Sequence, residues 1–373
     1  MKFLLLLIAA SLIGREQKPA IVDTPCHYCE SYTHLHSANP CSENPCNPHR
    51  WGGKVDASFA VWQAKEEGLN FAFDNSPRFP QATYGTNPRS NISGQFIGPD
   101  FNWMPALKVN LGVEFPQKGW DMDLRWTFFY SHNNQTAHAN ATTAGFGLLP
   151  VWILPSADVS SPTLFGQARG SWQLHLNTID WELGYDFFLT KALSLRLSGG
   201  LKGVSLFQKF HVDYSEGILV NTLQPVSFST QMSNDALGLG PRIAFFSRWR
   251  LPKGFSLMAD IAGAFALTVF DMKREDNDAL LNSGAVNQVN SQYNESFWAY
   301  RPILECRMGL SWDTCYGARK QFPFGFDLFY ELQNYWEQNM LRLLVANPVL
   351  HLAFPQRGDL MVQGMTLTFR FGY

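Results

Sequence analysis

Hydrophobic and polar residues alternate strictly along much of the chain, and this alternation predicts the elements. From Phe101 to Phe115, one parity carries large apolar side chains and the other carries polar ones such as Lys108 and Glu114. Trp120–Ser131 repeats the pattern after Pro116–Gly119, which reads as a tight turn. Because a period of two residues is that of a β-strand, both segments are predicted to be strands with one apolar and one polar face.

Similar segments continue to the last residue. Further strands are expected at Lys54–Asp74, Trp172–Leu189, Ala192–Phe210, Ala236–Leu251, Phe255–Phe270, Phe297–Trp312, Phe322–Tyr335 and Leu360–Tyr373. The apolar residues of Trp172–Leu189 change parity at Asn177–Thr178, which predicts a bulge. Strands of this length exceed the roughly five or six residues usual in soluble sandwiches. Bulky apolar rows suit lipid and the opposite polar rows suit a watery lumen, so the pattern predicts an all-β, transmembrane, antiparallel up-and-down β-barrel.

The connections between these segments alternate between short and long. Short connections are typical of the periplasmic side of such barrels, and long ones of the outer side. The long ones are 75–100, 132–170, 212–235, 272–295 and 336–359. Counting back from the C-terminus predicts ten strands with both termini in the periplasm. A turn at Lys65–Gly68 would break the first strand and favour twelve, the extra strand coming from Val220–Thr230 or Phe146–Leu154.

The N-terminus has the pattern of an export signal. Lys2 precedes the apolar run Phe3–Ile13, which is followed by small residues, so residues 1–14 are predicted to be a signal peptide. A buried N-terminal helix is the alternative. Residues 15–53 would form a periplasmic segment rich in Cys, Pro and His, and residues 54–373 the barrel.

Composition narrows the class further. Charged residues are only 16% of the chain and aromatic residues are 14%. Beyond the N-terminus no apolar run is long enough for a membrane-spanning helix. The net charge of −2 argues against nucleic acid as a partner, because phosphate binding needs clustered basic residues.

Several of these segments resemble one known family. Ala57–Ala72, Trp103–Ser131, Ile179–Gly203 and Thr366–Tyr373 are similar to the Legionella-type major outer membrane proteins, pore-forming barrels also found in Chlamydiae-like bacteria. The resemblance implies location in outer-membrane lipid, a porin-like role, no cofactor and no catalytic residues. The final aromatic row, Phe369, Phe371 and Tyr373, is similar to the signal that the barrel-assembly machinery reads.

Cysteines gather before the first strand. Cys26, Cys29, Cys41 and Cys46 have the spacing C-x2-C-x11-C-x4-C, with histidines nearby. Local disulfides, disulfide cross-links between copies of the chain, and a zinc site remain open. Export to an oxidising compartment favours disulfides over a metal, and spacing does not give their connectivity. Cys306 is expected to be an inert thiol facing lipid.

Charged side chains recur on the predicted inward parity. They are Lys108, Glu114, Asp121, Asp123, Arg125, Asp180, Glu182, Asp186, Arg242, Arg248, Arg250, Asp260, Arg301, Glu305, Arg307, Asp327, Glu331 and Arg370. Small residues between them, such as Gly112 and Gly184, are expected to leave room for water. The set therefore predicts a mixed-charge pore for passive diffusion of small hydrophilic solutes. Alternatively the charges pair and plug a narrow barrel with a structural or adhesive role.

A barrel hydrolase is a third possibility. It would need His or Asp beside a nucleophile at the rim. His132, His138, His211 and His351 lie near predicted strand ends or in connections, and no nucleophile is grouped with them in the sequence. We therefore expect no enzymatic activity.

Overall fold

The computed structural model describes residues 52–74, 94–116, 119–139, 147–152, 163–190, 192–219, 225–282, 285–316, 322–345 and 352–372. The expected signal peptide, the cysteine-rich segment up to Trp51, and Tyr373 lie outside these residues. Among the residues described, no helix has the length and apolarity needed to cross a membrane.

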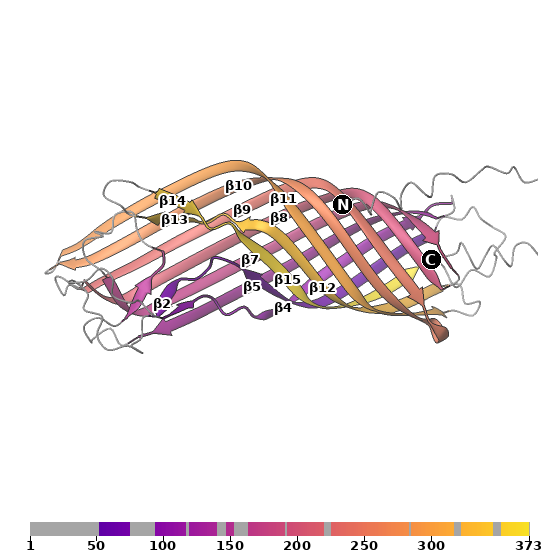
Figure 1. The fold of residues 1–373 in the computed structure, drawn as a ribbon, viewed down its shortest axis with the longest axis horizontal. Coiled ribbons are helices and arrows are strands. Elements are labelled where there is room, and N and C mark those ends of the chain that lie inside the picture. Colours follow the sequence, from indigo (N-terminus) through magenta and orange to yellow (C-terminus); the bar gives the residue numbers. More distant parts are fainter. Residues whose placement is uncertain are drawn as a thin grey trace, which may run out of the picture.

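Ten antiparallel strands close into a barrel in the described part of the chain (Figure 1). In ring order they are β1 (Gly52–Glu66), β4 (Trp103–Glu114), β5 (Trp120–His138), β7 (Thr163–Phe188), β8 (Leu193–Leu219), β9 (Pro225–Arg250), β10 (Phe255–Asn282), β11 (Ala285–Tyr316), β12 (Phe322–Asn339) and β15 (Gly358–Gly372). Pairing of β1 with β15, from Lys54 opposite Gly372 to Glu66 opposite Leu360, closes the ring. The predicted antiparallel barrel of ten strands is confirmed.

The first strand is shorter than predicted. β1 ends at Glu66, and a turn at Glu67–Gly68 follows, in which Gly68 adopts a φ of +80° that side chains disfavour. The count of ten survives because the next pieces stay out of the ring. Those pieces, β2 (Ala72–Asp74), β3 (Gln95–Ile97) and β6 (Leu148–Pro150), pair with one another, and β6 joins β7. A separate hairpin joins β13 (Arg342–Val345) to β14 (Leu352–Pro355).

Two of the expected long loops are mostly strand. β8 continues to Leu219 and β9 begins at Pro225, while β10 runs to Asn282 and β11 begins at Ala285. The prediction that 212–235 and 272–295 are loops is therefore wrong. Outward side chains here are polar, as at Gln231 and Lys273, so the lipid-facing pattern stops although the strand does not.

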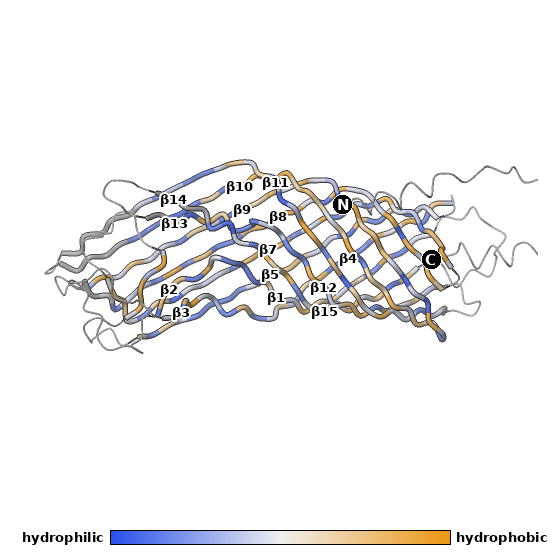
Figure 2. The backbone as a smooth tube through the Cα atoms, in the orientation of Figure 1, coloured by the Kyte–Doolittle hydropathy of each residue, from blue (hydrophilic) through white to orange (hydrophobic). Residues whose placement is uncertain are grey.

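An apolar belt surrounds the end of the barrel that carries the short connections, where orange segments recur along the strands in Figure 2. On β5 the outward row runs from Trp120 to Tyr130, and Leu124 near its middle is 44% exposed. Ten residue steps at ~3.4 Å each, tilted by roughly 40°, span about 26 Å, close to the ~25 Å apolar band of outer-membrane barrels. The described ends Gly52 and Gly372 lie at this end of the barrel.

The parity change at Asn177–Thr178 is not a bulge. β7 keeps an unbroken register with both β5 and β8 through these residues. Trp172, Leu174 and Leu176 point inward and are fully buried, whereas Trp181 and Leu183, on the opposite parity, are exposed on the outer face. The apolar row thus moves from the lumen to the lipid along one regular strand. The physical reason is that the lumen itself becomes apolar beyond the membrane.

That apolar stretch of lumen is a packed core. Its largest fully buried side chains come from the barrel wall and from segments folded inside it. The indole of Trp62 contacts Phe129 at 5.6 Å between ring centroids, and Trp152 contacts Phe210 at 5.7 Å. Trp152 also donates from its indole nitrogen to the carbonyl oxygen of Asn70 at 2.9 Å. These contacts belong to one buried apolar cluster that joins the inner face of the wall to segments folded inside the barrel.

Candidate functional site

A cavity of about 240 Å³ occupies the lumen at the periplasmic end of the barrel. Gly52, Arg250 and Gly372 stand at its mouth, and Lys108 and Glu331 line its inner part. Its walls carry eight basic and ten acidic side chains. They are Lys54, Lys108, Arg125, Arg196, Arg248, Arg250, Arg307 and Arg370, with Asp56, Glu114, Asp121, Asp123, Glu182, Asp186, Asp260, Asp313, Asp327 and Glu331.

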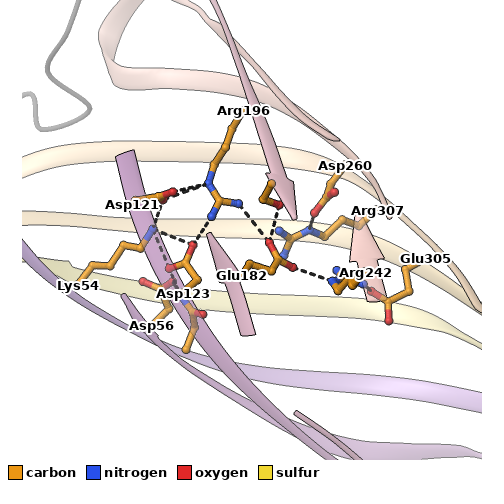
Figure 3. Close-up of polar contacts among 12 residues, drawn as sticks. Lys54, Asp56, Asp121, Asp123, Glu182, Arg196, Arg242, Asp260, Glu305 and Arg307 are labelled. Atoms are coloured by element: carbon orange, nitrogen blue, oxygen red, sulfur yellow. Dashed lines mark hydrogen bonds and ion pairs between the residues drawn. The ribbon is translucent and has the colours of Figure 1, made fainter. Parts of the chain in front are cut away.

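Near the mouth, two cations bridge two carboxylates (Figure 3). Lys54 of β1 lies 3.1 Å from Asp121 and 2.9 Å from Asp123, both on β5. Arg196 of β8 donates to the same pair, from Nε to Asp121 at 3.0 Å and from Nη2 to Asp123 at 2.8 Å. Asp123 and Glu182 are opposite each other in the sheet, so their mutual repulsion is relieved by the arginine between them.

Deeper in the lumen, ion pairs connect strands that are not neighbours. Arg242 of β9 donates from Nε to Glu182 of β7 at 2.7 Å and from Nη1 to Glu305 of β11 at 2.6 Å. Lys202 of β8 lies 2.6 Å from the other oxygen of Glu305 and 2.8 Å from Asp180. The bonds to Glu182 and Glu305 pass over intervening strands on the inner face and fix distances between strands two or three places apart in the ring.

Three further cations on the far side of the lumen are also paired. Lys108 bonds to Glu331, and Arg307 donates to Asp260 at 2.7 Å. Arg370 of β15 donates to Asp327 at 2.8 Å and also reaches Asp313. Such buried pairs fix geometry more than they add stability, while removal of one partner is costly.

The small inward residues hold these side chains rather than water. A Cβ atom added to Gly112 would lie 2.1 Å from the Lys54 side chain, and one added to Gly184 would lie 2.3 Å from Asp121. The expectation that glycines leave open volume is therefore wrong at these positions. The long charged side chains occupy the space.

The structure places the eighteen predicted lumen residues as follows. Fourteen line the cavity: Lys108, Glu114, Asp121, Asp123, Arg125, Glu182, Asp186, Arg248, Arg250, Asp260, Arg307, Asp327, Glu331 and Arg370. Asp180, Arg242 and Glu305 lie just beyond it in the ion-pair network. Arg301 is apart, buried over the ring of Phe270 and paired with Glu337 at 3.3 Å.

Sequence reasoning missed five charges of the cavity and its ion-pair network: Lys54, Asp56, Arg196, Lys202 and Asp313. Arg196 and Lys202 share the parity of the inward residues Ser194 and Ser198, so their place on β8 was readable. Lys54 belongs to the first strand, whose disturbed pattern hid its inward face. Asp313 lies near the end of β11, one residue beyond the predicted strand Phe297–Trp312.

A chain of hydrogen bonds between polar side chains lies at the boundary between the charged and the apolar parts of the lumen. Glu66 accepts a hydrogen bond from Gln208, whose oxygen accepts one from Asn234 at 2.9 Å. Asn234 also donates to the carbonyl of Gln338 at 2.9 Å, so the chain links β1, β8, β9 and β12. Glu66 lies beyond the lipid-facing belt, and burial raises its pKa to about 8.

The family of the chain follows from comparison with known proteins. Residues 43–372 match the family model described as Legionella pneumophila major outer membrane protein precursor. The chain belongs to this family. The lipid-facing belt agrees with that family's location, and the protein is an outer-membrane β-barrel. A comparison with curated proteins finds no match.

Solved barrels resemble the chain only loosely. The outer membrane protease OmpT from Escherichia coli is 10% identical with a TM-score of 0.37, over 86% of this chain and 96% of that one. The toluene transporter TodX from P. putida is 9% identical with a TM-score of 0.27, over 86% of this chain and 89% of that one. At such TM-scores neither similarity carries a functional argument.

Proposed function

We propose that the protein is a porin-like outer-membrane pore for small hydrophilic solutes, closed in this conformation by its apolar core. The cavity and its charged walls supply a hydrated path from the periplasmic mouth to the level of Glu331. A hydrophobic constriction closes a pore because water leaves it, and ions cannot cross without water. Solute passage therefore requires displacement of the core.

The observation that carries this proposal is the change of lumen from charged to apolar within one barrel. Arg125, Arg250 and Asp186 face the cavity without an ion pair among the described residues. A barrel with a purely structural role would gain nothing from such charges, because each must be kept hydrated. Beyond them Trp172 is fully buried and meets Phe101 at 5.6 Å.

A structural barrel that never opens is the second candidate. The close packing of Trp62, Phe129 and Trp172 around the lumen favours it, since a permanent plug has this form. Neither candidate assigns an enzymatic role.

Planar-bilayer recording of the refolded protein tests the proposal. We expect rare, small openings from the natural chain and frequent openings from Trp172→Ala, because that change removes a side chain from the closing layer. Leu237→Ala is the control, since Leu237 is 62% exposed on the outer face. A folded Trp172→Ala variant that stays silent at high protein load would refute conduction and leave the structural barrel.

A further inference from the structure

The cavity mouth contains charged side chains that the ion-pair network leaves unneutralised. Within the described part of the chain, Glu114 and Asp186 have no basic group within ion-pair distance. Arg250 has no carboxylate within that distance among the same residues. Each of these side chains is half-buried in the cavity wall. Half-buried charges without partners are costly, and a ligand that pairs with them recovers that cost.

The acidic charges gather on one side of the mouth, on β1, β4, β5 and β7. Five carboxylates, Asp56, Glu114, Asp121, Asp123 and Asp186, stand there beside two cations, Lys54 and Arg196, which leaves a local charge of −3. One oxygen of Asp56 is buried and has no hydrogen-bond partner in the part of the chain that the structure describes. This acidic side suits an ammonium group.

The basic charges stand on β9. Arg248 lies over the ring of Phe246 at 5.8 Å, and Arg250 over Phe188 at 5.5 Å. Among the described residues, Arg248 has one distant carboxylate, Asp313 at 3.6 Å, which Arg370 also holds, and its buried Nε has no hydrogen-bond partner there. A guanidinium held by its face against a ring keeps its edge N–H groups free for a carboxylate.

We propose that this cavity binds a small zwitterion, of the class of short peptides with free termini. The ammonium would lie against Glu114 and Asp186, and the carboxylate against Arg248 and Arg250. A simple anion would be repelled by the local charge of −3, and a simple cation would leave the two arginines without a carboxylate. A zwitterion pairs with the acidic side and the basic side at once. The volume of about 240 Å³ lies below the ~300–1,000 Å³ of pockets for drug-sized ligands, which fits a small solute.

The inference names a solute class for the proposed pore and rests on it for a role in transport. Binding itself needs only the closed barrel, so it is measured separately from conduction. A silent bilayer with intact binding would refute the pore alone. Conduction without binding would refute the zwitterion site alone.

Calorimetric titration of the micelle-folded barrel with three probes provides the test. The probes are dialanine, acetyl-dialanine, which lacks the ammonium, and dialanine amide, which lacks the carboxylate. We expect both capped probes to bind on the order of tenfold more weakly than dialanine, as for the loss of one charge-assisted hydrogen bond.

Two variants assign the ends of the ligand. Arg250→Gln should weaken dialanine on the order of tenfold and leave dialanine amide unchanged. Asp186→Asn should weaken dialanine and leave acetyl-dialanine unchanged. Neither residue forms an ion pair among the described side chains, so each substitution leaves the network intact. Asp271→Asn, on the exposed outer face of β10, is the matched control.

Three results would overturn the proposal. Equal binding of all three probes would show that the termini are not recognised. Absence of heat for dialanine, with the barrel still heat-modifiable on electrophoresis, would show that the cavity is not a site. Unchanged dialanine affinity in both variants would place binding elsewhere on the molecule.

Discussion

Leu124→Arg tests the assignment of the lipid-facing side directly. Leu124 is 44% exposed on the outer face of β5, and its row runs from Trp120 to Tyr130. It stands four residue steps above the first and six below the second, close to the middle of the apolar band. An arginine there must leave water for hydrocarbon or distort the bilayer around it.

The expected cost follows from depth. Arginine at the midplane of an outer-membrane barrel destabilises it by about 2–4 kcal/mol, and near the interface by about 0–1 kcal/mol. Leu251→Arg is the matched substitution, because Leu251 follows the end of β9 and is 45% exposed. The two variants make the same chemical change at similarly exposed leucines, one in the middle of a strand and apolar band and the other beyond a strand end.

Urea titration in lipid vesicles, followed by tryptophan fluorescence, measures both variants without removing a tryptophan. We expect a clearly lower midpoint for Leu124→Arg and a midpoint near that of the natural chain for Leu251→Arg. Equal midpoints would mean that Leu124 does not face hydrocarbon. The register of β5 against the bilayer would then have to be reassigned.

Other perturbations address the lumen and the termini. Glu66→Gln should remove a loss of stability with rising pH. The folded barrel keeps Glu66 protonated up to about pH 8, whereas the unfolded chain releases this proton near the ordinary pKa of a glutamate. The natural chain should therefore melt at a lower temperature at about pH 9 than at about pH 6, and the variant should not. Glu305→Gln should lower the free energy of unfolding, measured by urea titration, by about 3–5 kcal/mol, because it removes one of the two carboxylates paired with Lys202. Combining it with Lys202→Met should recover part of that loss. Phe371→Ser should slow assembly in cells, measured as the unfolded fraction on unheated gels, since Phe371 is 51% exposed to lipid at the end of β15. The four N-terminal cysteines should be oxidised in exported protein: a reductant-sensitive ladder on gels indicates cross-links, a shifted monomer indicates local bridges, and four freely alkylating thiols would refute both.

The barrel and its strand number were readable because lipid imposes one simple rule on every crossing strand. In the belt each outward side chain must be apolar, so alternation in segments such as Trp120–Ser131 carries the fold without any long-range information. Outside the lipid that rule lapses. The outward row of β10 turns polar at Asp271 although pairing continues to Asn282, and a strand without its pattern looked like a loop.

For a related reason, the sequence predicted which charged residues face the lumen but not how they pair. Parity placed Glu182, Arg242 and Glu305 on the inner face, but parity says nothing about what lies across the lumen. Ion pairs between strands that are not neighbours depend on barrel radius and stagger, which a local pattern does not contain. The parity change in β7 was the visible trace of the apolar lumen, and a bulge was the simpler explanation for one strand taken alone.

The strands that continue past the lipid determine how far the barrel projects above the membrane surface. In β11 the outward apolar row begins at Trp298, and the strand starts at Ala285, thirteen residues earlier. At ~3.3 Å per residue and a tilt of roughly 40°, this raises the strand tip on the order of 30 Å above the hydrocarbon. An antibody, phage or neighbouring cell would therefore touch the rigid polar flank of a hydrogen-bonded wall before it reached any lipid. Variation at the tips could change what is displayed at that height while the ladder beneath them stays the same.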